Sequence, residues 1–163
     1  MEPVEDNATL NALKEKFGET MLECGRDKGD LLAVVDPQRI HDVIAWLRDE
    51  PRLDFKMLVD LFGVDYLPRK PRFEVVYHLH CLDRNERLRV KIRLDEKNCE
   101  AATISDLYPV ANWLEREAWD MFGVVFTGHP NLKRLLMYEP FEGHPLRRDY
   151  PINKRQPLIG PKN

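Results

Sequence analysis

Residues 73–94, FEVVYHLHCLDRNERLRVKIRL, carry the clearest structural signal in the sequence. Apolar side chains alternate with other side chains through residues 73–81 and again through residues 88–94, which is the period of two expected for half-buried strands. The polar run at residues 83–86 between them is typical of a turn. The stretch therefore predicts an antiparallel hairpin whose second strand presents a basic face to water, formed by Arg89, Lys91 and Arg93.

Helix and strand signals alternate upstream of this hairpin. Residues 7–18 place apolar side chains at helical spacing, and residues 31–35 form a short apolar strand. Residues 36–50 begin with an Asp-Pro pair that suits a helix N-terminus and continue with the apolar stripe of a helix. Residues 55–66 fit a strand or a helix equally well.

Downstream of the hairpin, residues 106–122 predict a helix whose apolar arc covers about two-thirds of its circumference. Arg116 and Asp120 lie four residues apart on the remaining polar face and are expected to pair. Glu115 and Glu117 fall between aromatic positions, where an unpaired carboxylate is expensive to ionise. Either these glutamates reach solvent along the edges of the helix, or they meet arginine or backbone donors of the C-terminal segment or of another subunit.

These elements predict a mixed α/β (α+β) fold: one domain with a mostly antiparallel sheet flanked by helices. Charge and proline divide the chain further. Residues 127–163 carry seven Lys or Arg and three Asp or Glu, a balance of +4, whereas residues 1–126 carry 18 and 25, a balance of −7. Half of the 12 prolines lie in residues 127–163. We therefore expect an acidic body, residues 1–126, followed by an extended basic arm, residues 127–163, termed here the C-terminal arm.

The C-terminal arm contains too many apolar side chains for a freely solvated linker. Ordering its 37 residues costs roughly 37–74 kcal/mol of backbone entropy. At about 25 cal/mol per Å², this requires on the order of 1,500–3,000 Å² of apolar burial. The body has little spare surface of that kind. Either the arm is disordered alone or a partner supplies the surface, and its composition favours docking on a partner.

The composition and the missing motifs exclude several classes of function. The three cysteines are odd in number and form no CxxC pair, so neither disulfides nor a cysteine-ligated iron–sulfur cluster is expected. No GxGxxG motif or phosphate loop indicates a nucleotide pocket. The longest apolar stretches, residues 31–35 and 121–126, fall far short of the about 20 residues of a membrane-spanning helix. Residues 1–20 lack a secretory signal, so the cytoplasm is the expected compartment.

Four histidines are candidates for a chemical role. His78 and His80 share one strand face and Cys81 follows, which leaves a metal-dependent enzyme as an alternative, although two ligands alone are a weak signal. His129 and His144 each sit in a Gly-His-Pro unit, which suits a turn that presents an imidazole. No nucleophile or carboxylate constellation accompanies either of them. An RNA-binding module is a third alternative, based on basic pairs and aromatic residues of the arm: Arg147, Arg148, Lys154, Arg155, Tyr138, Phe141 and Tyr150.

The run EREAWDMFGV at residues 115–124 is followed by Phe126, by Gly-His-Pro at residues 128–130, by Leu132, by Arg-Leu-Leu at residues 134–136 and by PLRRDYP at residues 145–151. This series resembles the C subunit of respiratory NADH:quinone oxidoreductase, complex I. The resemblance extends to the layout of residues 60–66, 73–79 and 88–94, and it is closest to the short bacterial form. Equivalent subunits of membrane-bound hydrogenases and coenzyme F420 dehydrogenases are the alternative within the same class.

The resemblance implies a noncatalytic structural subunit in the hydrophilic arm of a membrane-associated complex that transfers electrons from NADH to quinone and translocates protons. It implies no cofactor on this chain, with iron–sulfur clusters, FMN, NADH and quinone held elsewhere in the complex. The expected partners are the homologues of the D and B subunits, without nucleic acid. The expected place is the cytoplasmic side of the bacterial inner membrane, where the chain is peripheral and meets the membrane only through the complex.

We expect the partner interface to use charged and aromatic groups of the motif region: Glu115, Arg116, Glu117, Asp120, His129, Arg134, His144, Arg147, Arg148, Asp149 and Tyr150. Of these, Arg147, Arg148 and Asp149 are expected to form charge-assisted bonds across the interface. We expect no catalytic, cofactor-binding or metal-binding residue on this chain. Enzymatic activity is then a property of the whole oxidoreductase.

Overall fold

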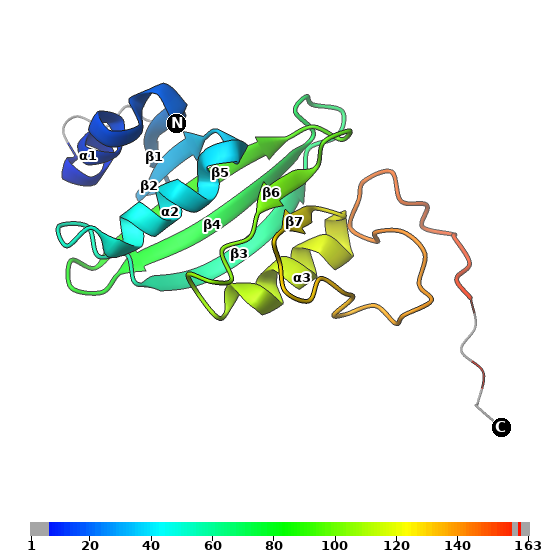
Figure 1. The fold of residues 1–163 in the computed structure, drawn as a ribbon. Coiled ribbons are helices and arrows are strands. Elements are labelled where there is room, and N and C mark those ends of the chain that lie inside the picture. The colour runs from blue at the N-terminus through cyan, green and yellow to red at the C-terminus, as the bar shows by residue number, and fades with distance from the viewer. Residues whose placement is uncertain (1–6, 158–159, 161–163) are drawn as a thin grey trace.

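The computed structural model describes residues 7–157 and residue 160. A five-stranded sheet in the order β1-β2-β5-β4-β3 forms its centre, and a small parallel sheet pairs β6 with β7 (Figure 1). Helices and strands follow one another along the chain in this order: α1 (Ala8–Phe17), η1 (Gly18–Thr20), β1 (Met21–Asp27), β2 (Asp30–Val35), η2 (Pro37–Arg39), α2 (Ile40–Asp49), β3 (Met57–Asp65), β4 (Phe73–Cys81), β5 (Glu86–Leu94), β6 (Glu100–Ala102), α3 (Ala111–Phe122) and β7 (Val125–Thr127).

The sheet confirms the predicted fold class. β4 and β5 form the antiparallel hairpin expected from their alternation, and β3 joins β4 in antiparallel fashion, which resolves residues 55–66 in favour of a strand. Only β2 and β5 run parallel within the large sheet. The sequence did not predict β1, which pairs with β2 through a tight turn at Lys28 and Gly29, where φ is 52° and 92°.

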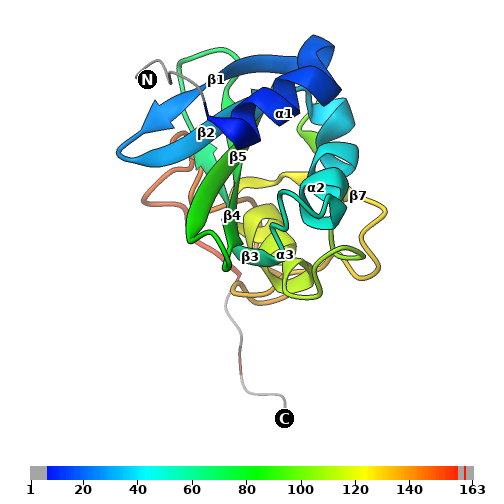
Figure 2. The ribbon, with the colours of Figure 1, turned by 90° about the vertical axis from the view of Figure 1, so that its left-hand side faces the viewer.

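All three α-helices lie along one face of the sheet (Figure 2). Their apolar stripes pack against alternate residues of the strands, and this contact forms the core. The largest fully buried side chains of this core belong to the sheet, to α1 and α2, and to the segments that join them: Tyr77, Phe55, Phe73, Phe126, Leu13, Leu31, Ile40, Ile44, Leu47, Leu79, Leu88 and Ile92. No helix in the described part of the chain is long and apolar enough to cross a membrane.

The opposite face of the sheet carries the basic residues of β5, and they are paired rather than free. Arg93 binds Glu23 of β1 at 2.5 Å, and Arg89 binds Asp30 of β2 at 2.5 Å. Lys91 lies 3.6 Å from Glu74 of β4. Cross-strand ion pairs therefore neutralise the face that the sequence predicts to be basic.

α3 begins later than predicted, at Ala111 rather than Asp106. Residues 104–110 form hydrogen-bonded turns that pass over the core before the helix starts. The helix then packs against β3, where Gly63 leaves space for the ring of Phe122: a Cβ at Gly63 would lie 2.8 Å from that ring. Gly123, with φ of 78°, ends the helix as predicted.

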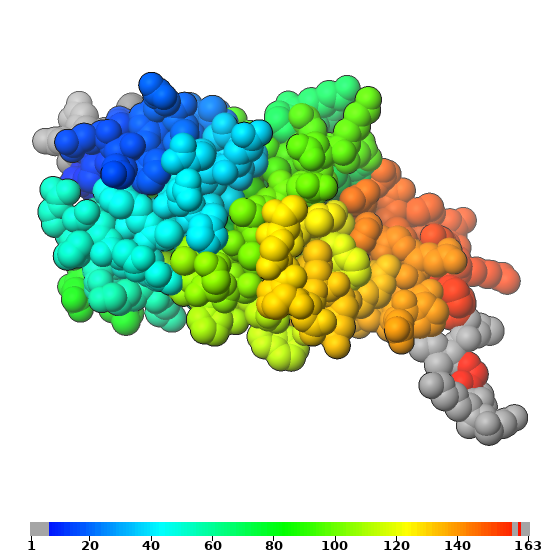
Figure 3. Space-filling model, in the orientation of Figure 1, coloured from blue at the N-terminus to red at the C-terminus, as the bar shows by residue number. Residues whose placement is uncertain are grey.

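The described part of the C-terminal arm packs on one end of the body. In Figure 3 its orange residues lie directly against the yellow residues of α3 and β7. The predicted boundary between residues 126 and 127 falls inside β7, which pairs with β6. The division into body and docking arm stays a prediction. Leu158 and Ile159, which contribute to the apolar content of the arm, lie outside the described residues.

The hydroxyl of Tyr77 yields the first testable prediction. Tyr77 is fully buried, and its Oη finds no hydrogen-bond partner among the described residues. Burial and the nearby Glu115 raise the pKa of Tyr77 well above its usual value. Because an unsatisfied buried hydroxyl is destabilising, Tyr77→Phe should raise the free energy of unfolding by about 1 kcal/mol.

Tyr108→Phe is the matched control, because the Tyr108 hydroxyl donates to the carbonyl oxygen of Phe55. This second variant should lose about 1 kcal/mol. Urea denaturation of the two variants and of the parent chain measures both changes. Equal losses in the two variants would mean that Tyr77 has a partner.

Candidate functional site

The candidate site is the junction between α3 and the C-terminal arm, and Asp120 lies at its centre. This carboxylate is fully buried. Its Oδ2 accepts hydrogen bonds from three consecutive backbone amides, those of Leu135, Leu136 and Met137, at 2.9–3.0 Å. Burial alone would raise the pKa of Asp120, but these amides and Arg134 outweigh it and lower the pKa. The arm therefore wraps an ionised carboxylate.

Arg134 completes the shell around Asp120 and extends it along the arm. Its Nη1 donates to Asp120 Oδ1 at 2.6 Å, while its Nη2 donates to the carbonyl oxygens of Phe141 and Gly143. The guanidinium also lies near the rings of Trp119 and Phe141, 5.7 and 5.4 Å from their centroids. One arginine thus connects Asp120 of α3 to residues 141–143 of the arm.

Arg116 does not pair with Asp120, contrary to the sequence prediction. Its Nε and Nη2 donate to the carbonyl oxygens of Lys133 and Arg134 at 3.1 and 3.0 Å. The i,i+4 spacing does place both side chains on one side of the helix. There they bind opposite polar groups of one backbone segment, because Arg116 supplies donors to carbonyls and Asp120 supplies acceptors to amides.

A second ionic cluster binds residues 148 and 149 of the arm to the sheet. Arg72 is buried and makes a two-pronged contact with Asp65, at 2.8 and 3.0 Å, at the end of β3. The same guanidinium bonds Asp149 of the arm at 2.6 Å and Glu96 at 2.6 Å. The bonds to Asp65 and Asp149 raise the pKa of Arg72.

Asp65 also binds the arm directly, since its Oδ2 accepts the backbone amide of Arg148 at 2.8 Å. Burial alone would raise the pKa of Asp65. The bonds from Arg72 and from the amides of Arg148 and Leu67 overcome this effect and hold the pKa at about 2. Asp65 is therefore ionised at any physiological pH.

Arg147 and Arg148 bind backbone carbonyls of this same chain. Arg147 Nε donates to Phe122 O at 2.6 Å, and Arg148 Nη1 donates to Leu67 O at 2.6 Å. Gly123 is required beside them, because a Cβ there would lie 2.5 Å from Arg147 Nη2. The bonds expected across a subunit interface thus have counterparts inside the chain, and the interface role of Arg147, Arg148 and Asp149 stays a prediction.

Glu115 and Glu117, which the sequence places alike at the edges of packed aromatic surface, have opposite environments. Glu115 is fully buried and accepts the amide of Ile104 at 2.7 Å and the hydroxyl of Thr103. Burial raises the pKa of Glu115 to about 7, and these two bonds offset only part of the effect. Glu117 is exposed. The hydrogen-bond donors to Glu115 belong to the segment before α3. From the arm, His129 Nε2 lies 3.9 Å from Glu115 Oε2.

The two Gly-His-Pro units place their imidazoles against α3. The ring of His129 contacts the carbonyl oxygen of Asn112 at 3.1 Å, and that of His144 contacts the carbonyl oxygen of Asp120 at 3.0 Å. Burial lowers the pKa of His144. The third aromatic residue expected at the interface, Tyr150, stacks on Phe141 within the arm, with centroids 6.0 Å apart.

The strand histidines are not arranged as a metal site. His78 meets the edge of Phe62, with ring centroids 5.7 Å apart, and His80 contacts Asn85 at 3.3 Å. Cys81 is buried on the helix side of the sheet. Across the described ranges 7–157 and 160, no three His, Cys, Asp or Glu side chains are placed to hold a metal ion.

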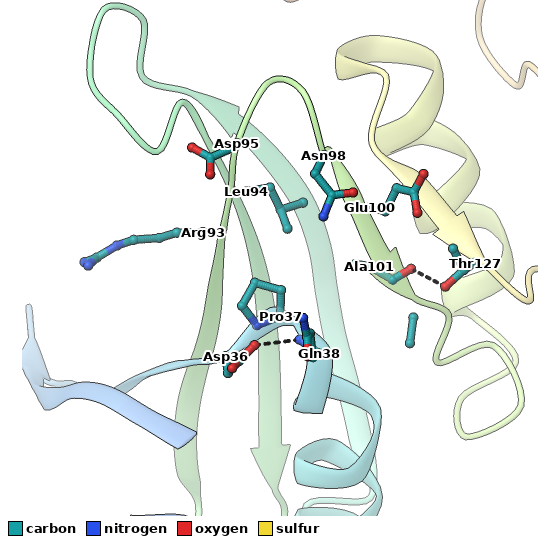
Figure 4. Close-up of a pocket in the computed structure, with 11 residues that line it drawn as sticks. Asp36, Pro37, Gln38, Arg93, Leu94, Asp95, Asn98, Glu100, Ala101 and Thr127 are labelled. Carbon is teal, nitrogen blue, oxygen red and sulfur yellow. Dashed lines mark hydrogen bonds between the residues drawn. The ribbon is translucent and has the colours of Figure 1, made fainter. Parts of the chain in front are cut away.

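The groove drawn in Figure 4 lies between η2, the end of β5 and β6 and encloses about 410 Å³. Its charged side chains do not converge. Arg93 points away, toward its ion pairs on the sheet, and Glu100 points to the side of β7. Asp36 is occupied in capping η2 through the amide of Gln38. This groove therefore offers no catalytic constellation, and the α3–arm junction remains the best-developed polar site.

Sequence reasoning missed two members of the second ionic cluster, Asp65 and Arg72. Both come from the segment DYLPRKPR at residues 65–72, and neither stands at a spacing that marks a pair. Asp65 and Arg72 lie side by side because β3 and β4 are adjacent antiparallel strands. Asp65 ends β3, and Arg72 directly precedes β4. The one available signal was an acid at the end of an apolar strand.

Removal of the Asp120 carboxylate is the prediction that follows from the junction. Asp120→Ala leaves Arg134 and three amides without their acceptor, so it should cost about 3–5 kcal/mol of unfolding free energy. The matched control is Glu117→Ala on the same helix, which should change stability by less than about 0.5 kcal/mol because Glu117 is exposed. Urea denaturation measures both. Similar small effects in the two variants would contradict the assigned role of Asp120.

The raised pKa of Glu115 predicts a dependence of stability on pH. Its ordinary value is 4.5 and its value in the fold is about 7. Between these pH values the folded state holds a proton that the unfolded state releases, so stability falls as the pH rises and the effect is complete above about 7. Relative to the parent, Glu115→Gln should gain stability between pH 5 and pH 8, by up to about 3 kcal/mol.

Urea denaturation of the parent, of Glu115→Gln and of the control Glu117→Gln at pH 5, 6, 7 and 8 tests this dependence. Other titrating groups are common to all three chains and cancel in the differences. The Glu117→Gln curve should stay parallel to that of the parent. A Glu115→Gln curve that is also parallel would show that Glu115 titrates normally.

Comparisons with known proteins agree with the motif resemblance. The family model described as "Respiratory-chain NADH dehydrogenase, 30 Kd subunit" matches residues 33–156. The C subunit of NADH-quinone oxidoreductase from Roseiflexus sp. (strain RS-1) is 48% identical over 152 residues, which cover 93% of this chain and 87% of the relative. The C subunit from Citrifermentans bemidjiense is 43% identical over 158 residues, which cover 96% and 97%.

Two solved structures resemble the fold. One is a trypsin-resistant fragment (1–134) of Nqo5, with a TM-score of 0.66 and 33% identity over 76% of this chain and 98% of the fragment. The other is from an archaeal membrane-bound sulfane sulfur reductase, with a TM-score of 0.73 and 24% identity over 89% of this chain and 85% of the other, and it supports the fold alone. The alternatives of a different parent complex and of an autonomous enzyme are not favoured. This chain belongs to the family of the 30 kDa subunit of respiratory-chain NADH dehydrogenase, which includes the C subunits of NADH-quinone oxidoreductase.

Proposed function

We propose that this chain is a noncatalytic bracket in the hydrophilic arm of a proton-translocating NADH:quinone oxidoreductase. Membership of this family implies other subunits of the complex as partners. The charged groups of the α3–arm junction support a structural role, because they bind backbone amides and carbonyls instead of facing a common pocket. The chain then supports electron transfer by holding other subunits of the complex in position.

The specific partners proposed are the homologues of the D and B subunits, and the C-terminal arm is the element that meets them. The observation that carries this proposal is the combination of a firmly anchored backbone with uncovered apolar side chains. Arg134 bonds Asp120, and Arg72 bonds Asp149, so the arm is fixed at two points along its described part. Between and beyond these anchors, Leu136 and Leu146 are 56% and 55% exposed, and Ile152 is fully exposed. Such side chains on an ordered segment favour burial against a partner.

The expected interface residues other than Glu115 divide into two groups on this proposal. Glu117, Arg148 and Asp149 are exposed and can contact a partner directly. Seven others hold the arm in its place and act on the interface through it: Arg116, Asp120, His129, Arg134, His144, Arg147 and Tyr150. Glu115 is buried, bonds the segment before α3 and reaches the arm only at His129, 3.9 Å away.

The cofactors of the parent complex belong to its other subunits in this proposal. Iron–sulfur clusters, FMN, NADH and quinone would be bound there, while this chain holds the cluster-bearing and quinone-binding subunits in register. It would lie on the cytoplasmic side of the bacterial inner membrane as a peripheral subunit that reaches the membrane only through the complex. The name of the Nqo5 relative describes a fragment that resists trypsin, which supports a body stable apart from the rest of that chain.

The test replaces exposed apolar side chains of the arm by a charge. The double variant Leu146→Asp and Ile152→Asp should lower the amount of this chain recovered with the purified complex at least tenfold, because a carboxylate cannot be buried cheaply at an apolar contact. Leu82→Asp is the control, since Leu82 is 66% exposed in the β4–β5 turn. Thermal unfolding of the isolated full chain should change little in either variant. Full recovery of the double variant in the complex would refute the docking role.

A further inference from the structure

Toward the helix N-terminus, the side of α3 that binds the arm carries apolar side chains that are about half exposed. Backbone of residues 133–137 covers the helix at Arg116 and Asp120. Trp113 lies one turn before Arg116, on the same side of the helix, and is 58% exposed. Val110, just before the helix, is 47% exposed and lies one further turn away. Val110 and Trp113 thus form an apolar stripe next to the part of α3 that residues 133–137 cover.

Trp113 is held in place although it is exposed. The guanidinium carbon of Arg116 lies 5.0 Å from the centroid of its indole. Arg116 is itself buried and fixed by its two bonds to the arm backbone. The indole is therefore braced on one side and open on the other. A large aromatic side chain fixed before binding loses little entropy on contact, which is the property of an interface anchor.

Glu117 gives this stripe a charge. It lies four residues after Trp113, one turn along the same helix, and is exposed. Within the part of the chain that the structure describes, it joins no ion pair, whereas Glu115 and Asp120 on the same helix are both hydrogen-bonded. A cationic side chain on a partner would meet an unpaired carboxylate here, which favours the correct partner and its orientation.

We infer that Val110, Trp113 and Glu117 form a second docking surface, and that its occupant is a neighbouring subunit with an apolar pocket for the indole and a Lys or Arg for Glu117. This inference rests on the proposed function and adds a contact beside the arm. It explains why Arg116 is used to brace an exposed tryptophan. A partner seated on the arm at residues 133–137 would reach the stripe without a gap, because the two surfaces adjoin at Arg116.

Hydroxyl-radical footprinting of the intact complex and of the isolated full chain tests the inference. Oxidation of Trp113 should fall at least fivefold in the complex. Leu22 supplies the reference rate, because it is also 58% exposed but lies on β1. Unchanged oxidation of Trp113, with Leu146 and Ile152 protected, would overturn the inference and leave the arm-docking proposal intact. Unchanged oxidation at all three positions would overturn both. Protection of Trp113 in the isolated chain that grows with its concentration would identify a second copy as the occupant and overturn the stated one.

Variants add a second readout. In cells that express tagged parent and variant chains together, Trp113→Ala and Glu117→Lys should each enter the complex at least tenfold less than the parent. Glu117→Gln should fall between them and the parent, while Leu22→Ala should compete equally. Thermal unfolding of each isolated chain separates a docking defect from misfolding. Equal entry of Trp113→Ala and the parent would overturn the anchor role of the indole.

Discussion

The contact on which this architecture depends is the hydrogen bonding of the Asp120 carboxylate to Arg134 and to three consecutive amides of the arm. An irregular segment leaves its backbone groups without the partners that a helix or a sheet would provide, and these groups must be satisfied if it is to lie against a protein surface. Asp120 satisfies three such amides from one helical position, and Arg116 satisfies two carbonyls from another. The arm therefore acquires a fixed course without secondary structure of its own.

The sheet contributes the second fixed point, and it does so with the same chemistry. Arg72 joins Asp65 of the sheet to Asp149 of the arm, while the amide of Arg148 returns to Asp65. Because Asp65 has a pKa of about 2 and Asp120 a lowered pKa, both anchors are ionised throughout the neutral range. Glu115, with a pKa of about 7, is the exception on α3: its hydrogen-bond donors lie within the body, while His129 Nε2 of the arm lies 3.9 Å from Glu115 Oε2. The anchors at Asp65 and Asp120 therefore keep their charge throughout the neutral range. The packing of α3 around Glu115, in contrast, depends on pH in that range.

Much of the fold could be predicted because its signals are local. Alternation over residues 73–94 defines the β4–β5 hairpin, and an Asp-Pro pair marks the helix that begins after residue 36. The site was less predictable because its partners are set by tertiary structure. Spacing alone suggested an Arg116–Asp120 pair, but each side chain has other partners in the arm. The positions of Glu115 and Glu117 between aromatic residues of the helix likewise suggested similar roles for both, although only Glu115 faces the core. The Asp65–Arg72 contact depends on strand order, which no short motif encodes.

The contrast between charged side chains that are bonded within the chain and exposed apolar side chains supports the proposed way in which this chain recognises its neighbours. Nearly every charged side chain of the junction is committed to an internal bond, and withdrawing one of them to bind a partner would leave a buried charge unpaired. Apart from the exposed carboxylate of Glu117, what remains available is apolar: Leu136 and Leu146 on the arm and Trp113 on α3. Ionic bonds then determine the shape of the surface, while apolar contact supplies the affinity between subunits. This division of roles suits the proposed task of keeping other subunits in register.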